Sequence, residues 1–156
     1  MLLTLTPKNF RDIGTMVYRT CPEIAARCIR MINKTKPDFQ DTSLISQLFT
    51  LFCEHNQMNS LTYQALRKTE NVYLRMVFIA IIIKLYNPEL LTSYSSSRMK
   101  KELRKEPANL LKTHPTWVSQ KVKIVCFHLE IYEQFAEDVS DAIFVLKSKL
   151  NKPVIA

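Results

Sequence analysis

Hydrophobic residues run without interruption from Met76 to Ile83, and only Arg75 and Lys84 bring charge close to this run. The stretch from Asn71 to Tyr86 contains no turn residue after its first position. A helix that is apolar on nearly every side is typical of a segment enclosed by protein. The pattern therefore predicts a central buried helix over residues 71–86, with the other elements packed around it.

The same run is too short to span a membrane. Crossing the hydrocarbon core takes about 20 consecutive apolar residues, and charged residues bracket a much shorter stretch here. The N-terminal sequence MLLTLTPK has neither a basic n-region nor a sustained apolar h-region, so it lacks the features of a secretory signal. We therefore expect no membrane partner and an intracellular protein with reduced thiols.

Amphipathic patterns predict four helices before the central one. The pair Thr6-Pro7 is typical of an N-cap and a first helical position, and Pro22 begins a second helix in the same way. A third helix begins at Asp41 or Thr42, and a shorter one spans about residues 60–68. The apolar residues that share one face of the first helix are Phe10, Ile13, Met16 and Val17. On the second helix we expect an inward stripe of Ile24, Ala25, Cys28, Ile29 and Ile32.

The second half of the chain is also divided by proline. Asn87-Pro88 ends the central helix and begins a loosely patterned one, which residues 93–97 kink or break before the basic segment RMKKELRKE. The alternating, β-branched segment TWVSQKVKIVCF predicts a hairpin in which residues 116–118 pair with residues 122–126. Two helices follow, over about residues 129–137 and 139–150.

Together these elements predict a mainly α fold. We expect a single compact multi-helix domain over residues 1–156, built around a central buried helix, with a small β-hairpin near its C-terminal third. The length of 156 residues and the 47% of hydrophobic residues suit one globular core. The single glycine, Gly14, excludes dinucleotide fingerprints and phosphate loops, which need several glycines.

The net charge of +8 is unevenly distributed: it is +3 for residues 1–70, +5 for residues 71–115 and 0 for residues 116–156. This positive charge favours an anionic partner, either nucleic acid or an acidic protein surface. The alternative is a basic protein whose charges are only solvated. We name the densest group the basic cluster, and its members are Arg98, Lys100, Lys101, Arg104 and Lys105. We expect it to contact phosphates or acidic partners. Because no aromatic stacking platform can be placed beside it, RNA contact without base readout is the more credible form.

Neither catalysis nor metal binding is predicted. A zinc site needs four ligands, and Cys53 and His55 are the only closely spaced Cys/His pair. Cys126 and His128 could supply a nucleophile and a base, but no third group orients them. The four cysteines lack C-x-x-C spacing, and each is interpreted as a small buried hydrophobe. We therefore expect no enzymatic activity and no cofactor.

Three segments stand out in their order along the chain: DTSLISQLFTLF, ALRKTENVYLRMVFIAIIIKLY and HLEIYEQFAEDVSDAIFVLKSKL. The second contains Tyr73-Leu74-Arg75-Met76. Together the segments resemble the pre-mRNA-splicing factor 38 family of spliceosomal proteins, whose Tyr-(Ile/Val)-Arg-aliphatic signature is similar to residues 73–76 and whose closing helices are similar to the third segment. Val77-Phe78 replaces the usual aliphatic-Gly step, and Phe144-Val145 replaces a leucine-proline step. The resemblance suggests a divergent, compact member.

This resemblance implies a non-enzymatic scaffold in the nucleus. Family members join the precatalytic spliceosome and act during its activation through protein contacts. The implied partners are a microfibrillar-associated-type splicing factor, a zinc-finger splicing protein and the tri-snRNP, and we expect a monomer. The alternative is a basic helical RNA-binding module that contacts phosphates without base specificity.

Two interpretations are open for Tyr73 and Arg75. They could form an exposed partner-binding pair, or Arg75 could be buried in the first turn of the central helix and paired with an acid. We favour the structural role, because burying an unpaired guanidinium is costly. The candidate acidic partners of Arg75 are Glu130, Glu133 and Asp141.

Overall fold

Residues 6–57, 72–92 and 98–150 are described by the computed structural model, and all the regular elements within these ranges are helices. The prediction of a mainly α chain is therefore confirmed for these ranges. Internal contacts divide the chain into two compact units, residues 1–36 and residues 37–156. A division by contacts does not decide how many domains fold independently, so the single domain over residues 1–156 stays a prediction.

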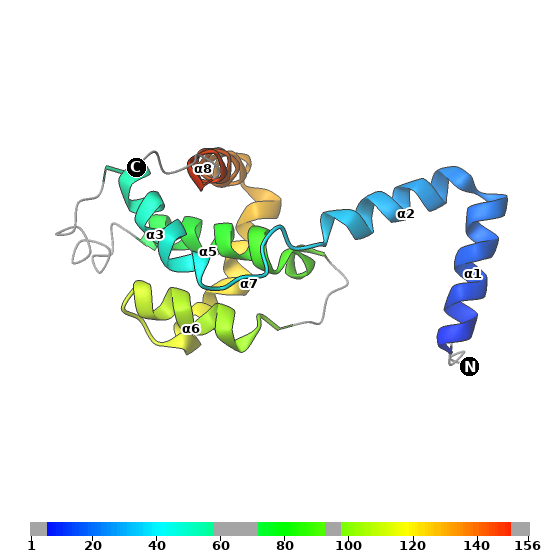
Figure 1. The fold of residues 1–156 in the computed structure, drawn as a ribbon, viewed down its shortest axis with the longest axis horizontal. Helices are drawn as coiled ribbons and strands as arrows, with labels where there is room; N and C mark the ends of the chain where they lie inside the picture. Colours follow the sequence, from blue (N-terminus) through cyan, green and yellow to red (C-terminus); the bar gives the residue numbers. More distant parts are fainter. Residues whose placement is uncertain (1–5, 58–71, 93–97, 151–156) are drawn as a thin grey trace. The chain divides into compact units, whose positions relative to one another are not determined.

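The first unit is a pair of helices, α1 (Pro7–Thr20) and α2 (Pro22–Lys34), drawn in blue in Figure 1. Both begin at a proline, as the sequence predicts. Thr6 and Asn9 form a capping box: the Asn9 amide donates to Thr6 Oγ1 at 3.3 Å, and the Thr6 amide donates to Asn9 Oδ1 at 2.9 Å. These bonds satisfy donors that the first turn of a helix leaves free.

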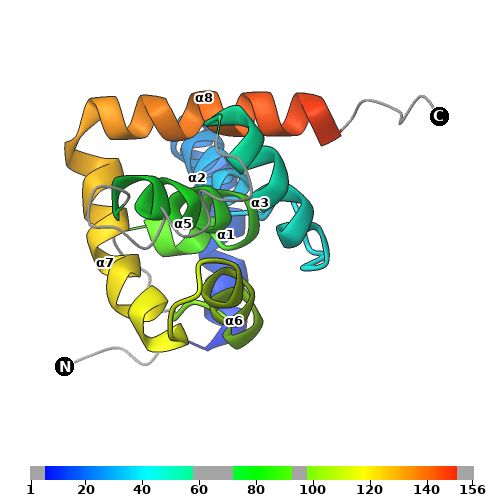
Figure 2. The same ribbon diagram turned by 90° about the vertical axis from the view of Figure 1, so that its left-hand side faces the viewer.

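The second unit is organised around α5 (Val72–Tyr86), in which every residue from Arg75 to Tyr86 except Lys84 is buried. Figure 2 shows α5 in the middle of this unit with other helices on several sides. The helices that pack against it are α3 (Leu44–His55), α6 (Lys101–Leu110), α7 (Pro115–Ile131) and α8 (Glu133–Leu150). The unbroken apolar run is thus buried because neighbours cover all of its faces.

Aromatic and aliphatic side chains of α3 and α8 supply much of this cover. The rings of Phe49 and Phe52 lie 5.1 and 5.4 Å from the ring of Phe78, between centroids. On α8 the buried residues recur every three or four positions, at Phe135, Val139, Ala142 and Leu146. Full burial of such a side chain contributes about 1.5–3 kcal/mol, so these stripes hold α3 and α8 on α5.

The predicted β-hairpin over residues 116–126 is wrong, because this segment lies inside the helix α7. The helix begins at Pro115, and the His114 side chain caps it by accepting a hydrogen bond from the Thr116 amide at 3.2 Å. Val118 and Val125 are fully buried two turns apart. β-propensity spans only about 1 kcal/mol and depends on context, so burial along a helical stripe outweighs the β-branched composition.

Several boundaries also differ from the prediction. The helix expected over residues 129–137 is interrupted at Tyr132, where α7 has ended and α8 has not yet begun. Between Asn87 and Thr92 the chain forms the short 3₁₀ helix η2 (Pro88–Leu91). The helix predicted over residues 60–68 and the kink over residues 93–97 lie outside the described residues. Among the helices that are described, none is both long enough and apolar enough to span a membrane.

Candidate functional site

The α1–α2 pair presents apolar side chains to solvent. Among the described residues of this unit, Ala25 is the one that is buried, and Val17 is half-buried. The exposed large apolar side chains are Phe10, Ile13, Met16, Tyr18, Ile24, Ile29, Met31 and Ile32. The inward stripe predicted for the second helix is therefore wrong at every position named except Ala25. Two helices alone are too few to bury two wide apolar faces.

The opposite faces of the same helices are basic. At 100° per residue, Lys8 and Arg19 lie across α1 from Phe10, whereas Arg11 lies at the edge of its apolar face. Arg27 and Arg30 lie on the polar side of α2. Residues 1–36 carry a net charge of +5. We name the exposed apolar side of α1 and α2 the N-terminal apolar face.

Tyr73 and Arg75 point to different neighbours, because residues two apart in a helix lie about 200° apart. The Tyr73 hydroxyl donates a hydrogen bond to the Asp138 carboxylate of α8. Its ring meets Phe135 edge to face, with 5.6 Å between centroids. Burial raises the pKa of Tyr73 to about 12, and the hydrogen bond and negative charge of Asp138 act in the same direction. The pKa of Asp138 is lowered, chiefly by the hydrogen bond from Tyr73 and also by one from Gln134.

Arg75 lies on the side of α5 that faces α7. Its side chain is 8% exposed, and its guanidinium carbon lies 5.8 Å from the centroid of the Trp117 ring. A cation over an indole face is attracted by the ring quadrupole. Glu130, Glu133 and Asp141 are all exposed, and their pairing with Arg75 stays a prediction.

The structure divides the basic cluster among three surroundings. Arg98 and Arg104 line a pocket of about 310 Å³ together with side chains of α7. Lys100 lines a different pocket, and Lys101 and Lys105 are exposed outside both. The full lining of the first, which we name the α6–α7 pocket, is Arg98, Met99, Arg104, Ser119, Val122 and Lys123. The five basic residues therefore do not form one continuous stripe.

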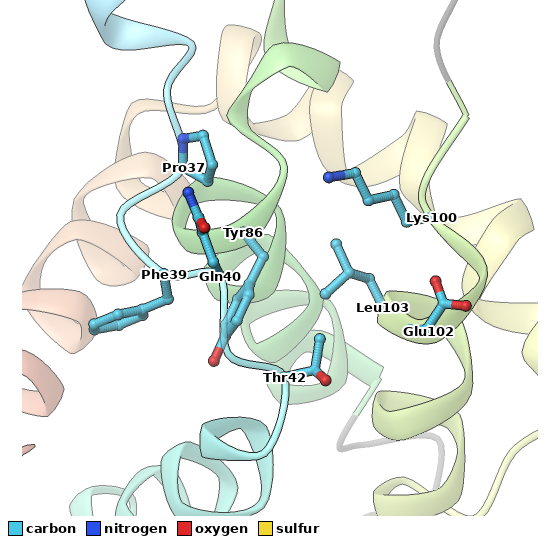
Figure 3. Close-up of a pocket in the computed structure, with 8 residues that line it drawn as sticks. All are labelled: Pro37, Phe39, Gln40, Thr42, Tyr86, Lys100, Glu102 and Leu103. Carbon is cyan, nitrogen blue, oxygen red and sulfur yellow. The ribbon is translucent and has the colours of Figure 1, made fainter.

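The pocket that includes Lys100 lies where the segment before α3 passes the end of α5 and the start of α6 (Figure 3). It measures about 250 Å³, and its lining combines Lys100 with Glu102 and the apolar Leu103. The Tyr86 hydroxyl, on another wall, donates to the Asp41 carbonyl oxygen at 3.0 Å. One lysine beside one glutamate gives this pocket no excess of either charge.

The α6–α7 pocket, in contrast, gathers charge of one sign. Arg104 Nη1 donates to Ser119 Oγ at 3.2 Å, and Ser119 Oγ donates to the Pro115 carbonyl oxygen at 3.1 Å. The ion pairs seen among the described residues, Lys147–Asp38 and Lys149–Glu54, do not include Arg98, Arg104 or Lys123. This arrangement is suited to holding an anion.

Sequence reasoning missed Ser119 and Lys123 as members of this site. Both lie in the segment that was predicted as a hairpin. In the helical register Ser119, Val122 and Lys123 are spaced i, i+3, i+4 and share one face. The cap and proline at His114-Pro115 are the signals that could have revealed this register.

The cysteines divide into two classes. Cys21 and Cys28 are exposed, so their interpretation as buried hydrophobes is wrong, whereas Cys53 and Cys126 are half-buried. Burial raises the pKa of the Cys126 thiol, which donates to the Leu90 carbonyl oxygen at 3.7 Å. Because α7 is helical, Cys126 and His128 face different sides, and the His128 ring packs 4.8 Å from that of Tyr132. Within the described ranges, no three His, Cys, Asp or Glu side chains group closely enough to bind a metal ion.

Comparisons with protein-family models, with curated proteins and with solved structures find no match to this chain.

Proposed function

We propose that this chain is a non-enzymatic scaffold that acts in the precatalytic spliceosome during its activation, through protein–protein contacts. The observation that carries the scaffold role is the N-terminal apolar face, on which eight large apolar side chains are exposed. Large apolar side chains gathered on the surface of a protein mark sites where another molecule binds. The spliceosomal setting rests on the resemblance around Tyr73 and Arg75.

The basic sides of α1 and α2 favour partners with acidic residues beside an apolar stripe. Amphipathic partner helices laid along the N-terminal apolar face would bury Phe10 on α1 and Met31 on α2 and place their acids near Arg11 and Arg30. Other spliceosomal proteins, including a microfibrillar-associated-type splicing factor and a zinc-finger splicing protein, are the proposed occupants.

Affinity purification of the tagged full chain from a splicing-competent nuclear extract tests this proposal. We expect recovery of the tri-snRNP and of activation factors, and a loss of at least about fivefold in the double variant Phe10→Glu/Met31→Glu, since charge on an apolar hot spot typically costs more than 1 kcal/mol. Thr15→Glu/Ala26→Glu is the matched control, because it adds the same two charges to the polar sides of α1 and α2. Recovery of ribosomal or vesicle-coat proteins instead would overturn the proposal.

A further inference from the structure

We propose that the α6–α7 pocket binds a phosphomonoester group carried by a protein partner. The choice of a protein as the carrier rests on the proposed scaffold function. The phosphate site itself does not depend on that function, because it is argued from the side chains of the pocket alone.

The first argument is the concentration of positive charge. Arg98 precedes α6, Arg104 lies on α6 and Lys123 lies on α7, yet all three line one cavity of about 310 Å³. Among the described residues, none of the three forms an ion pair with a carboxylate. Like charges gathered without a counterion repel one another. An anion bound between them would remove this repulsion and accept charge-assisted hydrogen bonds.

The second argument is the hydrogen bonding of Arg104. Its Nη1 is held by Ser119 at 3.2 Å, which ties the guanidinium to α7. Its Nε is buried and has no acceptor among the described residues. Buried donors without acceptors are uncommon in folded proteins, and a guanidinium with donors to spare suits a phosphate group, which offers several acceptor oxygens.

The arrangement favours a monoester over the diester of a nucleic-acid backbone. A phosphomonoester carries a charge of about −1.5 to −2 at neutral pH and has three acceptor oxygens, which matches three cations around one cavity. Binding of a nucleic-acid strand calls for a basic groove that follows the backbone. Here Lys100 lines another pocket, and Lys101 and Lys105 lie outside both, so no such groove continues along α6.

The surface beside the pocket favours a protein as the carrier. Ile124, Phe127 and Ile131 recur along α7 with 41%, 53% and 56% of their surface exposed. Lys123 and Phe127 are four residues apart and are therefore neighbours on the helix surface. Apolar side chains that flank a phosphorylated residue could contact this stripe while the phosphate occupies the pocket.

The test is a titration of the full chain with N-acetylphosphoserine amide, followed through its amide signals by nuclear magnetic resonance. We expect saturable binding that shifts the signals of Arg104, Ser119 and Lys123, and no binding of N-acetylserine amide. Because each variant removes a charge-assisted hydrogen bond to the phosphate, Arg98→Gln and Lys123→Gln should each weaken binding at least about tenfold. Both residues are exposed, so these variants should fold.

The matched control is Lys105→Gln, which removes one charge from α6 outside the pocket and should change the affinity by less than about twofold. Equal weakening by Lys105→Gln would show general attraction and overturn the proposal. Dimethyl phosphate, a diester, should bind about tenfold more weakly than the monoester because it carries less charge. Equal binding of the diester, or tighter binding of oligouridine that also shifts Lys101 and Lys105, would overturn the proposal in favour of RNA. Failure of the monoester to bind would refute it whatever is recovered from nuclear extract.

Discussion

The Tyr73 hydroxyl donates a hydrogen bond to the Asp138 carboxylate and so joins the first turn of α5 to α8. The two residues are far apart in the sequence, and the bond forms beside the edge-to-face contact of Tyr73 with Phe135. A second polar contact between the same helices links Lys84 Nζ to Ser140 Oγ at 3.2 Å. The polar start of the buried helix is therefore fixed by specific partners, whereas its apolar body is held by packing.

Acid should weaken the fold partly through Asp138. Its pKa is lower in the folded state than the value of about 3.9 in an unfolded chain. The ionised carboxylate therefore stabilises the fold above about pH 4, and this contribution is lost as the pH falls through the lower folded value. Asp138→Asn should lower the free energy of unfolding by about 0.5–1 kcal/mol near neutral pH, a small effect because solvent exposure weakens the hydrogen bond. In acid the same substitution should lower it by less.

Urea denaturation at a series of pH values measures this dependence. Glu137→Gln is the control, since it removes a neighbouring exposed carboxylate and should change stability by less than about 0.5 kcal/mol. If the free energies of unfolding of the wild type and of Asp138→Asn differed by the same amount down to low pH, the stabilising role of ionised Asp138 would be contradicted.

Removal of Arg75 should destabilise the second unit. Arg75 is buried over Trp117, and a desolvated cation over an indole contributes about 2 kcal/mol. We expect Arg75→Ala to lower the free energy of unfolding by about that amount, measured by the fluorescence of Trp117, the single tryptophan of the chain. Lys121 Nζ lies 5.7 Å from the same ring, but Lys121 is less buried than Arg75. Lys121→Ala should therefore lower the free energy of unfolding by only about 0.5 kcal/mol.

Two outcomes distinguish the interpretations of Arg75. Unchanged stability together with lost recovery of the proposed spliceosomal partners would assign Arg75 to partner binding instead. Double-mutant cycles of Arg75→Ala with Glu130→Gln, Glu133→Gln or Asp141→Asn would reveal which of these acids, if any, is coupled to it.

The helical register of α7 makes opposite predictions for two adjacent residues. Val125 is fully buried, so Val125→Ala should cost about 2 kcal/mol through the loss of packed methyl groups. Ile124 is 41% exposed, and alanine is the better helix former, so Ile124→Ala should change stability by less than about 0.5 kcal/mol. Thermal denaturation followed by circular dichroism compares the two. A greater loss from Ile124→Ala would contradict this register.

Thiol reactivity should follow the two classes of cysteine. Cys21 and Cys28 are exposed, whereas burial raises the pKa of Cys53 and Cys126, and the charge of Glu54 raises that of Cys53 further. Because the thiolate is the reactive form, iodoacetamide should modify Cys21 and Cys28 first in the native protein. Mass spectrometry of timed samples identifies the modified residues, and denatured protein serves as the control. Early modification of Cys126 would contradict its burial.

The sequence by itself determined the starts of α1 and α2 and the burial of α5, because each depends on residues that are neighbours in the chain. Thr6-Pro7 and Pro22 mark real helix starts, because a cap and a fixed proline φ act within one turn. The run from Met76 to Ile83 predicted a buried helix, because a helix without a polar side must be covered on all sides. These inferences needed no knowledge of distant contacts.

Tertiary structure alone decided what each surface meets. The β-branched residues around Val122 favour a strand locally, but burial of Val118 and Val125 makes the segment a helix. An amphipathic pattern shows that α1 has an apolar face. It does not show whether the chain supplies enough neighbouring helices to cover that face. The meeting of Arg104 with Ser119 and Lys123 likewise follows from how α6 packs on α7. Periodicity along one segment contains no information about which other segment lies opposite, so the pocket became visible only in the folded chain.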